Sequence, residues 1–82
     1  MELGDFLVNY DDAGNLLVLR TTPGNAMSVA AALDDMNWQE IIGTIAGDDT
    51  VLVISKSPAQ IEIVKERIRQ TIDSYIKPFA KR

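Results

Sequence analysis

The segment that most constrains the fold is Gly43 to Ser55, which reads GTIAGDDTVLVIS. Its two halves are apolar and rich in β-branched residues, and Gly47, Asp48 and Asp49 interrupt them with a turn signal, so the segment predicts a β-hairpin with two carboxylates at its tip. The second arm, Val51 to Ile54, is apolar at every position, which means that both faces of this strand need cover. A small domain rarely covers both faces, so we expect other copies of the chain to contribute.

The composition narrows the class of function. The 82 residues are expected to form one domain, residues 1–82. It is large enough for a single core, but only about 60 to 65% of the unfolded surface can be buried at this size, so oligomerisation would add stability. The chain has no Cys and no His, so the usual general base and transition-metal ligands are missing, and we expect no enzyme and no cofactor. The net charge of −4 argues against DNA binding by this chain alone. No apolar run reaches the ~18 residues of a membrane span and no leader is evident, so a cytoplasmic protein is expected.

A further hairpin is predicted near the start of the chain. Asp5 to Tyr10 and Leu16 to Arg20 are β-prone runs, and Asp11 to Asn15 between them contains the Asp, Gly and Asn of a short loop. Leu16 to Leu19 again lack polar alternation, which indicates a sheet that is buried on both faces.

Two helices are predicted. Thr22 before Pro23 reads as an N-cap and a first helical position, and the helix should run to about Met36. Its core stripe would comprise Ala26, Val29, Ala30 and Leu33. Met27, Ala31 and Asp34 form an adjacent stripe, whose ordinary explanation is a solvated edge of the helix.

The second helix should begin at Ser57, with Pro58 at its first position and Gln60 completing a capping box. We expect Pro78 to end it near Ile76. The apolar stripe of this helix is expected to comprise Ile61, Val64, Ile68, Ile72 and Tyr75. Its solvated side is expected to carry Glu62, Lys65, Glu66 and Arg69. Trp38, between the first helix and the Gly43–Ser55 hairpin, is expected to plug one end of the core.

The element order is therefore β-β-α-β-β-α. It predicts an α/β protein of the α+β type, a two-layer sandwich in which an antiparallel sheet of about four strands carries two helices on one face. The other sheet face would then be a large apolar patch, and self-association is the economical way to cover it.

Asp48 and Asp49 allow several interpretations. Adjacent extended residues point in opposite directions, so the two carboxylates are expected to have different surroundings. Turn chemistry is the ordinary explanation. A hard-metal site shared with Asp34 or Asp35 is a second, although no recognisable ligand spacing supports it. A third is a cation site, in which one carboxylate accepts both N–H groups of a guanidinium, the other takes an ammonium, and backbone groups of the preceding strand complete the site.

Three motifs resemble one bacterial family. They are Thr22 to Ala26 (TPGNA), the pair Leu33-Asp34 and above all Gly43 to Thr50 (GTIAGDDT). Together they are similar to the C-terminal domain of the arginine repressor family over roughly Phe6 to Arg69, with the spacing between motifs intact. The last block is highly specific, and it favours a ligand-binding role for the two aspartates over turn chemistry.

The resemblance implies a domain that trimerises through its sheets, pairs two trimers into a hexamer and binds L-arginine between them as a co-repressor. In the family, a winged helix-turn-helix domain precedes this domain and binds operators of arginine metabolism genes; we do not expect residues 1–82 to include it. Carried over by position, Thr44 and Ala46 would hold the amino-acid end of the ligand, and Asp34 and Asp49 would supply further polar contacts. Asp48 would hold the guanidinium of an arginine seated in the facing trimer.

One position departs from the family pattern. The helix residue that is often Gln in the family is Met27 here, which removes an amide that could contact the ligand. Met27 therefore supports an alternative of another class, a purely structural oligomerisation module with a degenerate arginine site. A carboxylate metalloenzyme is a third and weaker hypothesis.

Overall fold

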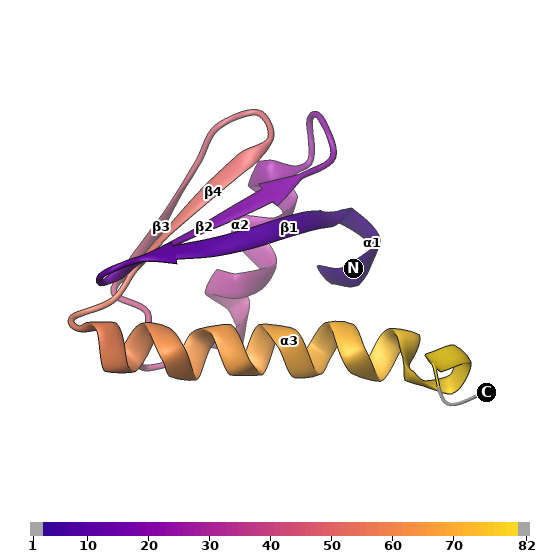
Figure 1. The fold of residues 1–82 in the computed structure, drawn as a ribbon. Coiled ribbons are helices and arrows are strands. Elements are labelled where there is room, and N and C mark those ends of the chain that lie inside the picture. Colours follow the sequence, from indigo (N-terminus) through magenta and orange to yellow (C-terminus); the bar gives the residue numbers. More distant parts are fainter. Residues whose placement is uncertain (1–2, 81–82) are drawn as a thin grey trace.

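The computed structural model describes the backbone of residues 3–80 and the side chains of residues 3–72 (Figure 1). The elements follow in the order α1 (Leu3–Phe6), β1 (Leu7–Ala13), β2 (Leu16–Thr21), α2 (Ala26–Met36), β3 (Gly43–Ala46), β4 (Thr50–Ile54) and α3 (Pro58–Ala80). The strands form one sheet in the order β1-β2-β4-β3, and every neighbouring pair is antiparallel. The predicted four-stranded antiparallel sheet is thereby confirmed.

One face of the sheet builds the core. Strand residues alternate between faces, and Leu17 and Leu19 of β2 are fully buried and lie opposite Val53 and Val51 of β4. Both helices cover this face, as predicted, and they contribute Ala26, Val29, Ala30, Leu33, Ile61, Val64 and Ile68 to the same buried cluster. No helix in the described part of the chain is long and apolar enough to cross a membrane.

The opposite face of the sheet, which we call the open face, carries apolar side chains that no described helix covers. Ile45 lies opposite Leu52, and Leu52 lies opposite Val18, so a row of three crosses the sheet. Ile45 is 62% exposed, while Leu52 and Val18 are half-buried by their neighbours. The two-faced apolar pattern of the strands therefore reflects one face in the core and one face exposed to solvent.

The beginning of the chain differs from the prediction. A short helix, α1, occupies residues that were expected to start a strand, and its Leu3 is buried in the core. The predicted loop is also shorter, because β1 continues to Ala13 and only Gly14 and Asn15 form the turn. Gly14 has a φ of +61°, a conformation that glycine adopts without steric cost.

The predicted start of α2 was wrong. Thr22 and Pro23 do not cap the helix; they belong to a turn in which the Asn25 N–H donates to the Thr22 carbonyl at 3.2 Å and Gly24 has a φ of +82°. Proline followed by a glycine of positive φ is typical of a type II turn. The helix begins after it, with Asn25 at the N-cap position and without a side-chain capping bond.

α3 begins as predicted, because the Ser57 hydroxyl accepts a hydrogen bond from the N–H of Gln60 at 3.3 Å. The predicted end near Ile76 was wrong, since the helix includes Pro78 and runs to Ala80. A proline removes one backbone hydrogen bond and kinks a helix without always ending it. The side chain of Tyr75, which was assigned to the apolar stripe, lies outside the described residues.

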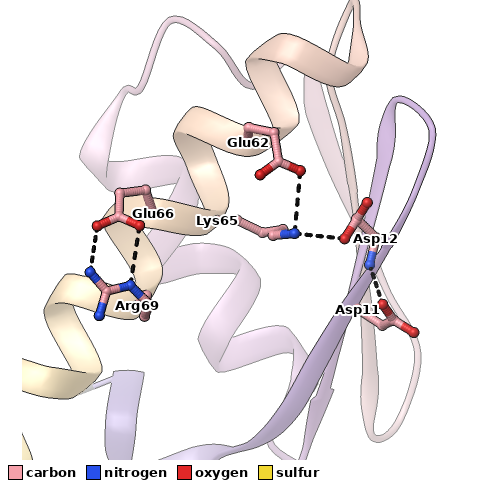
Figure 2. A network of polar contacts seen from close by, with 6 residues as sticks. All are labelled: Asp11, Asp12, Glu62, Lys65, Glu66 and Arg69. Carbon is pink, nitrogen blue, oxygen red and sulfur yellow. Dashed lines mark hydrogen bonds and ion pairs between the residues drawn. The ribbon is translucent and has the colours of Figure 1, made fainter.

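The solvated side of α3 carries the predicted charged residues (Figure 2). Glu66 pairs with Arg69, and Lys65 bridges Glu62 to Asp12 of β1. The hydrogen bond that Lys65 donates to Asp12 lowers the pKa of Asp12 and raises the pKa of Lys65. The helix is thereby tied to the β1–β2 hairpin.

Trp38 packs against the core, as expected, at the connection between α2 and β3. The Arg67 guanidinium lies 5.4 Å from the centre of its ring and donates to Glu40 at 2.6 Å. The pKa of Glu40 is lowered, first by its own backbone N–H and then by Arg67. These contacts fix the loop that leads into β3.

Candidate functional site

The predicted site residues lie mainly along β3, where α2 runs beside the strand in the opposite direction. At one end, the Thr44 hydroxyl of β3 donates to Asp34 Oδ1 near the end of α2, at 3.0 Å. At the other end, the N–H of Ala26, the first residue of α2, donates to the carbonyl of Asp48 at 3.3 Å. We call Asp34, Thr44, Ala46 and Asp48 the edge site.

The main chain of β3 offers open hydrogen-bonding groups in the edge site. β3 is an edge strand with β4 as its neighbour. The Gly47 N–H donates to the Thr50 carbonyl at 2.8 Å, and bonded positions recur at every second residue of an antiparallel pair. The N–H and C=O groups of Thr44 and Ala46 therefore point away from β4. An extended ligand or another chain would find donors and acceptors there.

The hairpin tip is docked onto the start of α2 by its backbone. The carbonyl of Asp48 accepts from the N–H groups of Gly24 and Ala26, at 3.2 and 3.3 Å. The Asp48 side chain is exposed, and its carboxylate has no hydrogen bond or ion pair within the described part of the chain. The turn that displaced the predicted helix start thus positions a free carboxylate.

Asp49 has different surroundings. Its Oδ1 accepts from the Thr50 hydroxyl at 2.9 Å, and its Oδ2 lies 3.6 Å from the Arg20 guanidinium. Arg20 and Thr50 are directly opposite each other in β2 and β4, on the open face. The Asp49 carboxylate therefore has partners on the open face, whereas the Asp48 carboxylate has none within the described part of the chain. Asp49 does not join the edge site.

Met27 lies in the first turn of α2, and 73% of its surface is exposed. At the other end of the helix, a cavity of about 310 Å³ borders Asp34 and Gly43 and is otherwise lined by Leu33, Asn37, Trp38, Gln39, Ile41 and Ile42. Nothing joins Met27 to this cavity, because the two lie at opposite ends of α2.

The structure therefore brings Asp34 and Thr44 into direct contact, with Ala46 further along the same strand and Asp48 in the turn that follows it. Arg20 was missed by the sequence analysis, although one signal was available: it is the only Lys or Arg among residues 1–55. Within residues 3–72, no group of three or more acidic side chains gathers to hold a metal ion, so the hypothesis of a metal site finds no support there.

Comparison with known proteins agrees with this architecture. Residues 3–70 match the family described as the C-terminal domain of the arginine repressor, and the chain belongs to that family. The arginine repressor of Staphylococcus saprophyticus is 53% identical over 64 residues, which are 78% of this chain and 43% of that protein. The arginine repressor of Staphylococcus aureus strain JH9 is 53% identical over 66 residues, 80% of this chain and 44% of the relative. The chain therefore spans less than half the length of these relatives, which are named arginine repressors.

Proposed function

We propose that this chain is the L-arginine-sensing oligomerisation domain of an arginine repressor. L-Arginine acts as a co-repressor that bridges two trimers into a hexamer, and the assembly regulates transcription of arginine metabolism genes. The family supplies the name of the ligand. The observation that carries the proposal is the edge site, in which the open main-chain groups of Thr44 and Ala46 lie on β3 and the unpaired Asp48 carboxylate lies in the turn that follows this strand.

The chemistry of these groups suits the two ends of arginine. A carboxylate accepts two parallel N–H bonds from a guanidinium, which makes Asp48 a partner for the side chain. The amino-acid end carries an ammonium and a carboxylate. Strand C=O groups and Asp34 accept from the ammonium, while strand N–H groups donate to the carboxylate. In the proposed arrangement, Asp48 receives the guanidinium of an arginine that is seated in the facing trimer.

Self-association through the open face is the second part of the proposal. Ile45, at 62% exposure, leads a row of apolar residues that another copy would bury. We expect the free chain to be at least trimeric at micromolar concentration. Ile45→Asp places a charge in this interface and should give folded monomers in sedimentation equilibrium, whereas Glu62→Asp on the outer side of α3 should not. An Ile45→Asp chain with the parent's mass would contradict assembly through this face.

L-Arginine then acts by mass action. A ligand that contacts two trimers binds the hexamer better than the trimer, so it shifts the population towards hexamers. Operator binding is assigned to a region outside these residues, because the chain is acidic and matches less than half of each relative. The chain by itself should give no sequence-specific gel shift, with or without arginine.

A calorimetric titration of the chain with L-arginine tests the proposal directly, with D-arginine and L-lysine as controls. We expect saturable binding of L-arginine and weaker binding of both controls. If L-arginine produces no binding heat at any temperature tested, the proposal is contradicted. The alternative, a structural module with a degenerate site, rests on the exposed thioether of Met27. Under that alternative the parent fails to bind, and Met27→Gln restores binding.

A further inference from the structure

The connection from α2 to β3 determines how the two sides of the edge site meet. Asp34 lies in the last turn of α2 and Thr44 lies in β3, and the Thr44 hydroxyl donates to Asp34 Oδ1 at 3.0 Å. The backbone of β3 is held by its pairing with β4, in which Thr44 lies opposite Val53. The end of α2 has no such pairing, so the position of Asp34 relative to Thr44 depends on residues 37–42, which join the two elements.

Packing within this connection is incomplete. The cavity of about 310 Å³ is lined both by the end of α2 and by the connection, and Asp34, Trp38 and Gly43 all border it. Side chains that border a void lose contacts on that side, and a region with few packed contacts is displaced more easily than a closely packed one. Direct packing alone therefore does not set the separation of α2 and β3, and contacts from other elements contribute to it.

Arg67 of α3 supplies such contacts. Its guanidinium donates to both carboxylate oxygens of Glu40, at 2.6 and 3.4 Å, and lies 5.4 Å from the centre of the Trp38 ring. Trp38 directly follows Asn37, the C-cap residue of α2, so a fixed Trp38 also restrains the last turn of that helix. The Ser55 hydroxyl donates to the Glu40 carbonyl, which ties the connection to the end of β4 as well. Arginine suits this position because its planar guanidinium can pair with a carboxylate and stack on a ring at the same time.

We propose that Arg67 is a positioning residue for the amino-acid end of the ligand. By holding two residues of the connection at once, it keeps the end of α2 at the distance from β3 at which Asp34 meets Thr44. This inference rests on the proposed function, in which Asp34 and Thr44 contact the amino-acid end of L-arginine. Arg67 acts through these two residues and not by contact with the ligand.

A double-mutant cycle on the whole chain tests this role. The affinity for L-arginine is measured by calorimetry in the parent, in Arg67→Met, in Thr44→Val and in the variant with both changes. Arg67→Met should weaken binding about fivefold in the parent, the order expected for one misplaced hydrogen bond. In the Thr44→Val background it should weaken binding less than twofold, because residues that act through one contact are not additive. A residue that only supports the fold would weaken both backgrounds equally, and that result would overturn the inference.

Lys65→Met is the matched control. Lys65 is also a cation of α3 that pairs with another element, Asp12 of β1, and its loss changes the net charge equally. Because this exposed pair lies on the other hairpin, Lys65→Met should change the affinity for L-arginine by less than twofold. A loss as large as that of Arg67→Met would contradict a specific role for Arg67.

NMR of the chain without ligand separates this inference from the proposed function. Arg67→Met should shift the amide signals of Asp34 and Thr44, and Lys65→Met should leave them in place. If the parent does not bind L-arginine, the proposed function fails, and the amide signals still show whether Arg67 controls the contact between Asp34 and Thr44. Unchanged signals of both residues in Arg67→Met would overturn the inference whatever the affinities are.

Discussion

Both hairpins of the sheet carry two adjacent aspartates, Asp11 and Asp12 in one and Asp48 and Asp49 in the other. In the first hairpin, Lys65 of α3 donates to Asp12 at 2.7 Å, and Asp11 accepts from a neighbouring backbone N–H at 2.9 Å (Figure 2). In the second, Asp49 has an intrachain partner and Asp48 has none among the described residues. Both hairpins therefore carry a pair of adjacent aspartates, but they differ in the side chains from elsewhere in the chain that contact these carboxylates.

That difference follows from the placement of the helices. α3 runs past β1, so its lysine can neutralise the first hairpin. The second hairpin is docked by backbone bonds onto the turn before α2, and this docking uses the carbonyl of Asp48 and leaves its carboxylate free. A carboxylate is thus available for a ligand where the neighbouring element supplies only backbone groups.

The largest expected effect comes from Asp48→Asn, which keeps the size and turn propensity of the residue and removes its charge. The chain should fold and form trimers normally, but it should bind L-arginine at least ~30-fold more weakly, because losing one partner of a largely desolvated charge pair costs about 2 to 5 kcal/mol. Isothermal titration calorimetry measures this. Asp11→Asn, in the first hairpin, is the control and should bind as the parent does. Equal affinities in Asp48→Asn and the parent would make Asp48 a turn residue only.

A smaller contrast is expected between the turn glycines. Gly14→Ala forces alanine into a φ of +61° and should destabilise the chain by about 1 to 2 kcal/mol. Gly47 does not have a positive φ, and an added Cβ would meet the Thr50 carbonyl oxygen at an ordinary 3.8 Å. Gly47→Ala should therefore change stability by less than about 0.5 kcal/mol. Urea denaturation of both variants checks this, and a larger loss from Gly47→Ala would show that the second tip is the strained one.

The smallest effect concerns pH. The folded pKa of Asp12 is lowered and that of Lys65 is raised by their mutual hydrogen bond. The Asp12 contribution is therefore present above its ordinary pKa of 3.8 and is lost as the pH falls through the lower folded value. The Lys65 contribution is present below 10.5 and is lost as the pH rises through the higher folded value.

Lys65→Met should accordingly lower the melting temperature slightly between these limits and less outside them. Thermal melts from pH 2 to pH 11 at constant ionic strength would show the difference. Because the pair is exposed, the change should be smaller than that of Gly14→Ala. A loss in Lys65→Met that is equally large at pH 2 and pH 7 would mean that the lysine acts through packing of its stem.

Much of the fold was predictable from local sequence. The Gly43–Ser55 hairpin, the buried stripe of α2 and the cap at Ser57 depend on residues close in the chain, and they were predicted correctly. The Thr22-Pro23-Gly24 segment was misread because Thr-Pro suits a helix start as well as a turn, and the positive φ of Gly24 decided between them. α1 was missed because four residues are too few for a helical period.

The partner of each carboxylate could not be predicted from local sequence. Arg20 meets Asp49 through the register of β2 and β4, and Lys65 meets Asp12 across 53 positions of sequence. Such contacts depend on the packing of distant elements, which periodicity and turn propensity do not specify. The contact between Thr44 and Asp34 likewise needed the direction of α2 along β3, although both residues had been assigned to the ligand by resemblance.

The central claim is that Asp48 links L-arginine to assembly, and sedimentation velocity tests it most directly. The parent and Asp48→Asn are compared at one micromolar concentration, each with and without saturating L-arginine. We expect the parent to shift from trimers to hexamers on addition of arginine and Asp48→Asn to remain trimeric in both conditions. A parent whose mass does not change with arginine, or an Asp48→Asn chain that shifts as far as the parent, would contradict the claim.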